Sequence, residues 1–239
     1  MGAVQITGQD FPYKCSRYNA EKREFAASAI FSNKIMTRLL LLFSILVSQS
    51  SFSQSFENDL VVAAIDRTRH EVRYDGSYLA IPYPNGDVPS NIGVCTDVII
   101  RSYRAIGTDL QQLVHEDMAE NFVSYPSKRI WGLKSPDKNI DHRRVPNLQT
   151  YFTRHGVKLA ISTNNKDYAP GDIVTWMLPG NLPHIGIVTN KKSGSTGNPL
   201  IAHNIGAGPN LEDMLFDYKI TGHYRYVPKA YNSTSNAAR

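Results

Sequence analysis

The sequence predicts an α+β domain in which N-terminal helices pack on an antiparallel β-sheet. Up to His155 the apolar residues recur at helical spacing, and after it short apolar runs are separated by Gly, Pro and Asn. Because the helices come first and the strands later, we expect the strands to pair in an antiparallel sheet.

The N-terminal part of this domain contains the helical patterns. Apolar stripes run over Glu57–Arg73, Cys95–Ile106, Asp109–Phe122 and Pro146–His155. Two irregular segments separate the helices: a Pro- and Gly-rich stretch over Asp75–Gly93 and a charged stretch over Ser124–Val145. The strand-like runs follow, over Asp172–Met177, His184–Thr189, Leu200–Ile205 and His223–Val227.

The residues before the domain have the pattern of a secretory leader. A basic stretch precedes the apolar run Leu39–Val47, and the small-residue pattern Ser51–Ser53 follows it. We interpret residues 36–53 as a signal peptide and residues 1–35 as an extension or a start codon assigned too early. The apolar run is shorter than the roughly 20 residues that a spanning helix needs. We therefore expect an exported bacterial protein, periplasmic or extracellular, with a signal anchor as the alternative.

Removal of the leader leaves residues 54–228 as a single domain and residues 229–239 as a polar, disordered tail. The leader holds six of the 26 Lys and Arg residues and three of the 21 Asp and Glu residues, so the remaining net charge is +2. This balance gives no case for nucleic-acid binding. Cys15 also leaves with the leader, so Cys95 has no partner for an intrachain disulfide. We expect a monomer.

Cys95 is the first candidate for chemistry. Exported proteins usually pair their cysteines or lack them, so a lone thiol points to a use for it. A helix N-terminus lowers a thiol pKa, whereas Asp97 in the same turn raises it, and we expect Arg101 to offset Asp97 one turn later. The alternative is that Cys95 is a small buried apolar residue.

His184 is the second candidate, because it stands at the head of an apolar strand. Gly186 lets a backbone or a substrate approach that strand closely. We predict that Cys95 and His184 meet in a solvent-reachable cleft as nucleophile and base. The next strand then supplies the orienter of the imidazole, with His203 favoured and Asn204 as the alternative, since the loop length decides which one faces His184.

This order of residues resembles that of the papain-like cysteine peptidases, and among them the NlpC-type bacterial cell-wall peptidases. In those enzymes the nucleophile starts a helix packed on an antiparallel sheet, the histidine lies on one strand and a polar residue on the next. The resemblance implies a papain-like fold and a cysteine hydrolase of amide bonds. One departure is that Val94 precedes Cys95 and Thr96-Asp97 follows it, where many relatives have Asp before and Ser-Gly after.

Longer strings are similar to a bacterial family known as domain of unknown function 1287 (DUF1287), for which no activity is settled. The similar segments are GVCTDVIIRSYRAIG, LVHEDM, NIDHRRVPNLQTYF, PGDIVTW, PHIGIV and HNIGAGPNLEDMLFDYKITGHYRY. They cover most of the chain after the leader.

Further residues are candidates for substrate binding. Arg143 and Arg144, next to His142, have the chemistry to clamp a substrate carboxylate, or equally to tie down an irregular loop. Tyr83 is a candidate to bind the substrate or an oxyanion, as are Ser90 and the backbone N–H of Cys95.

We therefore expect an exported cysteine hydrolase that cleaves amide bonds in peptidoglycan stem peptides. The alternative is a catalytically silent cell-wall-binding module of the same fold. A third hypothesis, a metal hydrolase using His184, His203 and His223, lacks the HExxH and Cys-x-x-Cys spacings of such sites. We expect no cofactor, no metal and no membrane span once the leader is removed.

Overall fold

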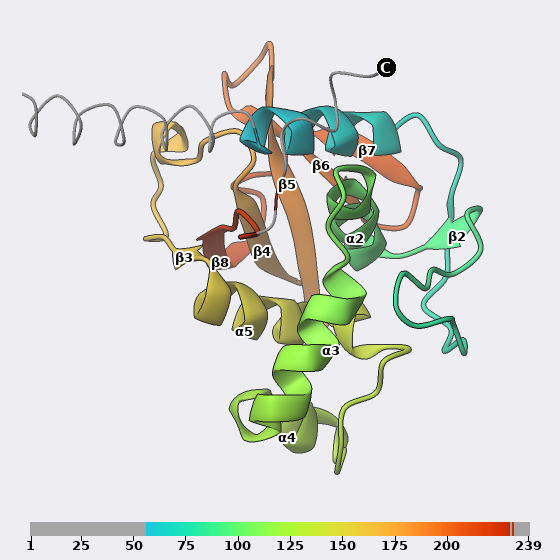
Figure 1. Ribbon diagram of the computed structural model, residues 1–239. Coiled ribbons are helices and arrows are strands. Elements are labelled where there is room, and N and C mark those ends of the chain that lie inside the picture. The colour runs from blue at the N-terminus through green and yellow to red at the C-terminus, as the bar shows by residue number, and fades with distance from the viewer. Residues whose placement is uncertain (1–55, 230, 232–239) are drawn as a thin grey trace, which may run out of the picture. The chain divides into compact units, whose positions relative to one another are not determined.

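The structure, a computed structural model, describes residues 56–229 and 231. The expected extension and signal peptide, and the tail beyond residue 231, lie outside this part of the chain. The described residues form an α+β domain with an antiparallel sheet, as predicted (Figure 1). None of the helices in this part is both long and apolar enough to cross a membrane.

Helices occupy the first half of the described chain. The first covers residues 56–67, and the others are α2 (Cys95–Ala105), α3 (Leu110–Asn121), α4 (Ser127–Trp131) and α5 (Val145–His155). The first helix stops before the expected Arg73, because the chain turns at residues 68–70 and then forms β1 (Arg73–Tyr74). The short helix α4 falls in a segment expected to be irregular, since five residues are too few to show an apolar stripe.

One six-stranded sheet follows, and its neighbouring strands are antiparallel. In spatial order the strands are β3 (Val157–Lys158), β8 (Lys219–Arg225), β4 (Ile173–Leu178), β5 (Leu182–Lys192), β6 (Pro199–Asn204) and β7 (Pro209–Glu212). The edge strands β3 and β7 were not expected, because each is short and lies beside glycine or proline. A separate parallel pair joins β1 to β2 (Ile92–Gly93).

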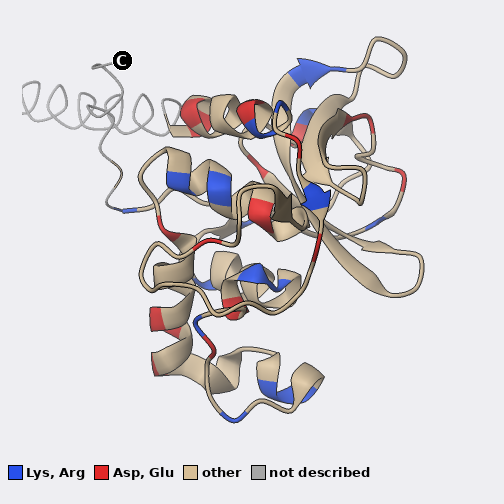
Figure 2. Ribbon diagram, turned by 90° about the vertical axis from the view of Figure 1, so that its right-hand side faces the viewer, with Lys and Arg blue, Asp and Glu red and all other residues tan. Residues whose placement is uncertain are grey.

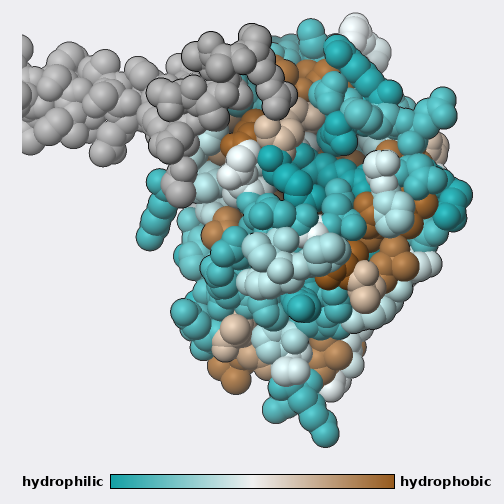
Figure 3. Space-filling model, turned by 45° about the vertical axis from the view of Figure 1, so that its right-hand side comes forward, coloured by the Kyte–Doolittle hydropathy of each residue, from teal (hydrophilic) through white to brown (hydrophobic). Residues whose placement is uncertain are grey.

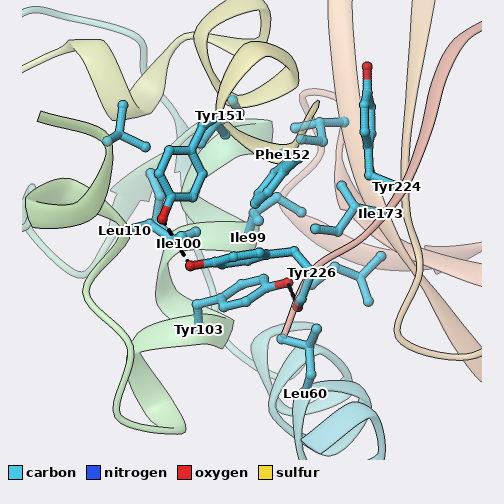
Figure 4. Packing of buried hydrophobic residues seen from close by; sticks show 14 of the residues in the cluster. Leu60, Ile99, Ile100, Tyr103, Leu110, Tyr151, Phe152, Ile173, Tyr224 and Tyr226 are labelled. Carbon is cyan, nitrogen blue, oxygen red and sulfur yellow. Dashed lines mark hydrogen bonds between the residues drawn. The ribbon is translucent and has the colours of Figure 1, made fainter. Parts of the chain in front are cut away.

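The two faces of the sheet belong to different hydrophobic clusters. Side chains of one face, such as Ile185 and Ala202, pack with the helices in the main core. In that core Tyr103, Tyr151 and Tyr226 lie together, with the Tyr103 hydroxyl donating to the Tyr226 carbonyl (Figure 4). Trp176 and its neighbours on the other face pack under the segment around Leu215. We call these the helix face and the far face.

Charged residues of both signs lie on the domain (Figure 2). Acidic and basic residues are interspersed along the ribbon (Figure 2). The space-filling view is mainly hydrophilic with scattered apolar spots (Figure 3). This mixed surface agrees with the near-balanced charge of the sequence.

Candidate active site

The N-terminus of α2 is held in place by a buried ion pair. The Asp97 carboxylate accepts the backbone N–H of Val94 at 2.7 Å, which satisfies one donor of the first turn. Arg143 reaches the same carboxylate through Nε and Nη2, both at 2.9 Å, and both side chains are buried. This bidentate pair orients the first turn of the helix that begins with Cys95.

Arg101 has a different partner from the one that the sequence suggested. Its guanidinium pairs with Asp87 at 2.9 Å and donates to the carbonyls of Val88, Pro89 and Ile92. The expected offset of Asp97 by Arg101 is therefore wrong, and Arg143 supplies it. Arg101 instead orders the loop that leads to β2 and Cys95.

The Cys95 sulfur lies inside the domain. The residue is 5% exposed and belongs to the main core together with Ile99 and Ile185. Three backbone N–H groups face the sulfur as hydrogen-bond donors, those of Ile185, Thr96 and Cys95 itself. Burial first, and then the neighbouring Cys95 and Asp97, raise the pKa of the Tyr74 hydroxyl to about 12, so Tyr74 of β1 lies beside Cys95.

The pKa of the Cys95 thiol is raised, whereas its position at a helix N-terminus predicted a lowered pKa. Burial raises the pKa of the thiol to about 12, even though the Ile185 N–H favours the thiolate, and the Asp97 charge raises the pKa further. Loss of hydration therefore outweighs the N–H donors at the helix N-terminus. Near neutral pH the resting residue is a thiol. The expectation of a solvent-reachable cleft at Cys95 is also wrong.

His184 belongs to a hydrogen-bonded chain on the far face. It pairs in register with Trp176 of β4, and the two rings are neighbours. The Nε2 atom of His184 and Nδ1 of His203 are 2.9 Å apart, and Nε2 of His203 is 3.1 Å from the Glu212 carboxylate. Burial lowers the pKa of His184 to about 3, and the nearby His203 lowers it further. Both rings are accordingly neutral at pH 7.

The predicted meeting of the Cys95 sulfur and the His184 imidazole is not found, because the two side chains lie on opposite faces of the sheet. The backbone N–H of Val188 donates to the Asp172 carbonyl, on the β4 side of β5. Backbone groups of successive strand residues point to opposite neighbouring strands, so the N–H of Ile185, three residues away, points toward β6. In the described chain, pairing between β5 and β6 stops at Ile187 and does not reach Ile185. The sulfur takes the N–H at this gap, next to the amide that joins His184 to Ile185. Among described residues no hydrogen bond links the sulfur to the imidazole.

Comparison with known proteins places this chain in a family. The family model described as Domain of unknown function (DUF1287) matches residues 61–226. The chain belongs to the DUF1287 family. A relative in Escherichia coli (strain K12), named Uncharacterized protein YijF, is 54% identical over 156 residues, which cover 65% of this chain and 75% of the relative. All residues of the candidate site lie within the matched DUF1287 domain.

The structure decides between the two expected orienters in this DUF1287 domain. His203 is the hydrogen-bond partner of His184, on the far face. Asn204 lies on the opposite face of β6, where its Oδ1 accepts the N–H of Gly206. The register places them so because Ala202, two residues from Asn204, packs with the helices.

The expected carboxylate clamp is wrong for Arg143, because its guanidinium is committed to Asp97 and to backbone carbonyls. Arg144 is similarly engaged: it pairs with Asp141 at 3.0 Å and lies 4.2 Å above the Trp131 ring. Both arginines serve the alternative that the sequence left open, the ordering of a loop.

His142 and Tyr83, the other two residues expected to bind substrate, lie among neighbours other than Cys95 and His184. His142 is buried, and burial together with the Arg143 charge lowers its pKa to about 3. Tyr83 packs edge-on against His115 of α3. Neither contact involves Cys95 or His184.

The third hypothesis finds no support in the arrangement of histidines. The Nε2 atom of His223 donates to the Asp172 carboxylate at 2.8 Å and the ring stacks on Tyr168, apart from the His184–His203 chain. Across residues 56–229 and 231, no three His, Cys, Asp or Glu side chains are grouped so as to hold a metal ion.

A large surface hollow lies one strand from the sulfur. It has a volume of about 1060 Å³ and is lined by residues of α4, α5 and β8. Gln149, in its wall, donates to Thr175, and Thr175 is the register partner of Ile185. The hollow does not include Cys95 or His184, so it is not the closed site itself.

Sequence reasoning missed two residues of this site. Glu212 lies on β7, and a signal for it existed: in a hairpin that pairs His203 with Asn210, position 212 returns to the face of His203. Tyr74 had no such signal, because its place beside Cys95 follows from the parallel pairing of β1 with β2.

Proposed function

We propose that this DUF1287 protein is an exported cysteine hydrolase of amide bonds, with the stem peptides of peptidoglycan as its substrate class. Cys95 is the nucleophile and His184 the base. The observation that carries the proposal is the position of the sulfur against the amide joining His184 to Ile185. The order of elements, which resembles that of papain-like and NlpC-type peptidases, and the export signal in the sequence support it.

The ring nitrogens of His184 have separate tasks in this proposal. Nε2 is occupied by His203, so Nδ1 is the nitrogen left for the thiol proton. Nδ1 is bonded to Cγ and is thus the ring nitrogen nearer to the backbone, where the sulfur lies. Because the sulfur and the ring lie on opposite faces of β5, the proposal requires that β5 rearranges when substrate binds, so that Sγ and Nδ1 come into contact.

The reaction follows from these positions. Cys95 gives its proton to Nδ1 of His184 and its sulfur attacks the amide carbonyl carbon. The carbon–nitrogen bond breaks, His184 returns the proton to the leaving amine, and a thioester remains on Cys95. Water, losing a proton to His184, then attacks the thioester, which releases the carboxylic acid and restores the thiol. The N–H of Cys95, which has no partner inside the helix, is a donor for the oxyanion.

Access to the site requires movement of Tyr74. Tyr74 is 43% exposed and lies beside Cys95, which is 5% exposed, so the proposal requires that the substrate displaces Tyr74 to reach the sulfur. A substrate that replaces Tyr74 would also bring a carbonyl group to the sulfur.

Digestion of purified peptidoglycan tests the proposal. Wild-type protein and Cys95→Ala are incubated with it, and released fragments are identified by mass spectrometry. We expect new amine and carboxyl ends with wild type and a loss of at least about a thousandfold with Cys95→Ala. Release by both proteins at the same rate would refute the role of Cys95. Thermal unfolding of both proteins checks that Cys95→Ala remains folded.

The silent binding module is the second candidate, and the burial of Cys95 favours it. It predicts co-sedimentation with peptidoglycan without release of fragments, equally for wild type and Cys95→Ala. Binding without cleavage by wild type would therefore favour this candidate over the hydrolase.

A further inference from the structure

Glu212 lies at the solvent end of the two buried histidines. Its carboxylate is 3.1 Å from Nε2 of His203, and its side chain is 40% exposed. The other carboxylate oxygen accepts from the Asn210 side chain at 3.0 Å. Glu212, His203 and His184 therefore form one continuous hydrogen-bonded chain. It runs from the surface at Glu212 to the buried ring of His184 on the far face of the sheet.

The direction of this chain follows from which groups can donate. A carboxylate accepts only, so the Nε2 atom of His203 must carry the proton of that hydrogen bond. A neutral imidazole has one N–H, which leaves Nδ1 of His203 as an acceptor. That acceptor faces Nε2 of His184, so Nε2 of His184 carries the proton and its Nδ1 is bare.

We infer that Glu212 is a positioning residue that selects, through His203, the tautomer of His184 whose Nδ1 is free to take the thiol proton. The inference rests on the proposed function for its catalytic meaning, but the tautomer itself does not depend on any activity. The inference also assigns a role to the edge strand β7, which places Glu212 on the same face of the sheet as His203.

The Glu212 carboxylate is the group that sets the donor-to-acceptor direction of the hydrogen bonds through His203 and His184. Burial lowers the pKa of both His184 and His203, so both rings are neutral near pH 7 and each has a single proton to place. Asn210 holds the outer oxygen of Glu212 and keeps the inner one turned to His203. If water or an amide replaces the Glu212 carboxylate, it can either accept from or donate to Nε2 of His203. Neither tautomer of His203, and so neither tautomer of His184, is then imposed.

Two variants and a matched control test the inference. Glu212→Leu removes the acceptor, and Glu212→Gln keeps the size but replaces one acceptor oxygen by a donor. Asp213→Asn is the control, because Asp213 is the neighbouring acid and its side chain bonds Thr196 and Asn198, away from the two histidines. Folding of each variant is checked by its thermal unfolding.

The first readout is the histidine tautomer, observed by two-bond ¹⁵N–¹H correlation spectra of ¹⁵N-labelled protein. We expect His184 to be protonated at Nε2 in wild type and in Asp213→Asn, and a mixture of tautomers in both Glu212 variants. A wild-type His184 protonated at Nδ1, or Glu212 variants with an unchanged spectrum, would overturn the inference.

The second readout is the release of peptidoglycan fragments. We expect Glu212→Leu to lower kcat about a hundredfold with KM within about twofold, because the base is held less often in its active tautomer. Activity that is lost in Cys95→Ala but complete in the Glu212 variants would refute the inference and leave the hydrolase intact. Activity that survives in Cys95→Ala would instead refute the hydrolase, while the spectra would still decide the role of Glu212.

Discussion

Cys95 carries two opposed influences on its acidity. The first turn of α2 and the Ile185 N–H favour the thiolate, whereas burial and Asp97 favour the thiol, and burial dominates. His184 is shifted in the matching direction, since burial lowers its pKa to about 3. A thiol and a neutral imidazole are thus the stable pair before substrate arrives, and charge separation is left to the complex.

The pH dependence of alkylation tests this resting state. Because the pKa of the thiol is raised to about 12, its thiolate fraction at pH 7 falls tenfold for each unit above the ordinary pKa. We expect iodoacetamide to react with Cys95 at least about a hundredfold more slowly than with an unstructured cysteine peptide, and the rate to rise still at pH 10.

The same protein in denaturant is the control, since unfolding returns Cys95 to ordinary thiol behaviour. A rate that reaches its plateau below pH 7 would show a preformed thiolate–imidazolium pair and contradict the resting thiol.

At the scale of elements, the start of α2 depends on a distant segment. The Asp97–Arg143 pair joins the first turn of the helix to the short 3₁₀ turn Asp141–Arg143, and Thr96 donates to the Arg143 carbonyl. Loss of one buried partner leaves the other charge without compensation. The position of Cys95 therefore depends on a side chain 48 residues away in sequence.

Replacement of either partner should be costly. We expect Asp97→Asn to lower the free energy of unfolding by about 3–5 kcal/mol, measured by urea denaturation, because Arg143 stays buried without its counter-ion. Arg73→Ala is the matched control: it breaks the exposed pair with Asp75 and should cost about 1 kcal/mol or less. Equal effects of the two substitutions would show that the buried pair does not hold α2.

The elements show how far the sequence alone can reach. Periodicity predicted the bounds of α2, α3 and α5 to within about two residues. It also predicted the existence of the four principal strands. Long segments with one apolar face are unambiguous, which is why both succeeded. The strand β7 was missed because glycines and a proline surround it. The partner of Asp97 was also missed, since one-turn spacing favours Arg101 whereas the tertiary fold supplies Arg143.

Within the candidate site, chemistry was easier to predict than geometry. Residue types marked Cys95, His184 and His203, but the face of each strand residue depends on loop parity, which composition does not reveal. The register places His203, and not Asn204, next to His184, while the role of His203 as orienter stays a prediction. The burial of Cys95 in the main core is the alternative that the sequence had left open, since Cys95 lies on the apolar stripe of its helix.

At the scale of the whole molecule, the sheet separates two halves of the proposed site. Cys95 approaches from the helix face, where the main core fixes α2, and His184, His203 and Glu212 lie on the far face. The gap between β5 and β6 is where the halves meet, because the N–H of Ile185 is free there for the sulfur. This arrangement makes the sheet itself the support of the proposed catalytic pair.

The most direct test of the central claim is detection of a thioester on Cys95. Wild-type protein is quenched in acid during incubation with peptidoglycan fragments, digested, and analysed by mass spectrometry with and without hydroxylamine. We predict a peptide that contains Cys95 and carries a fragment mass, lost on hydroxylamine treatment and absent when His184→Ala replaces wild type. Release of products with Cys95 unmodified at every quench time, or a fragment attached to another residue, would contradict the account.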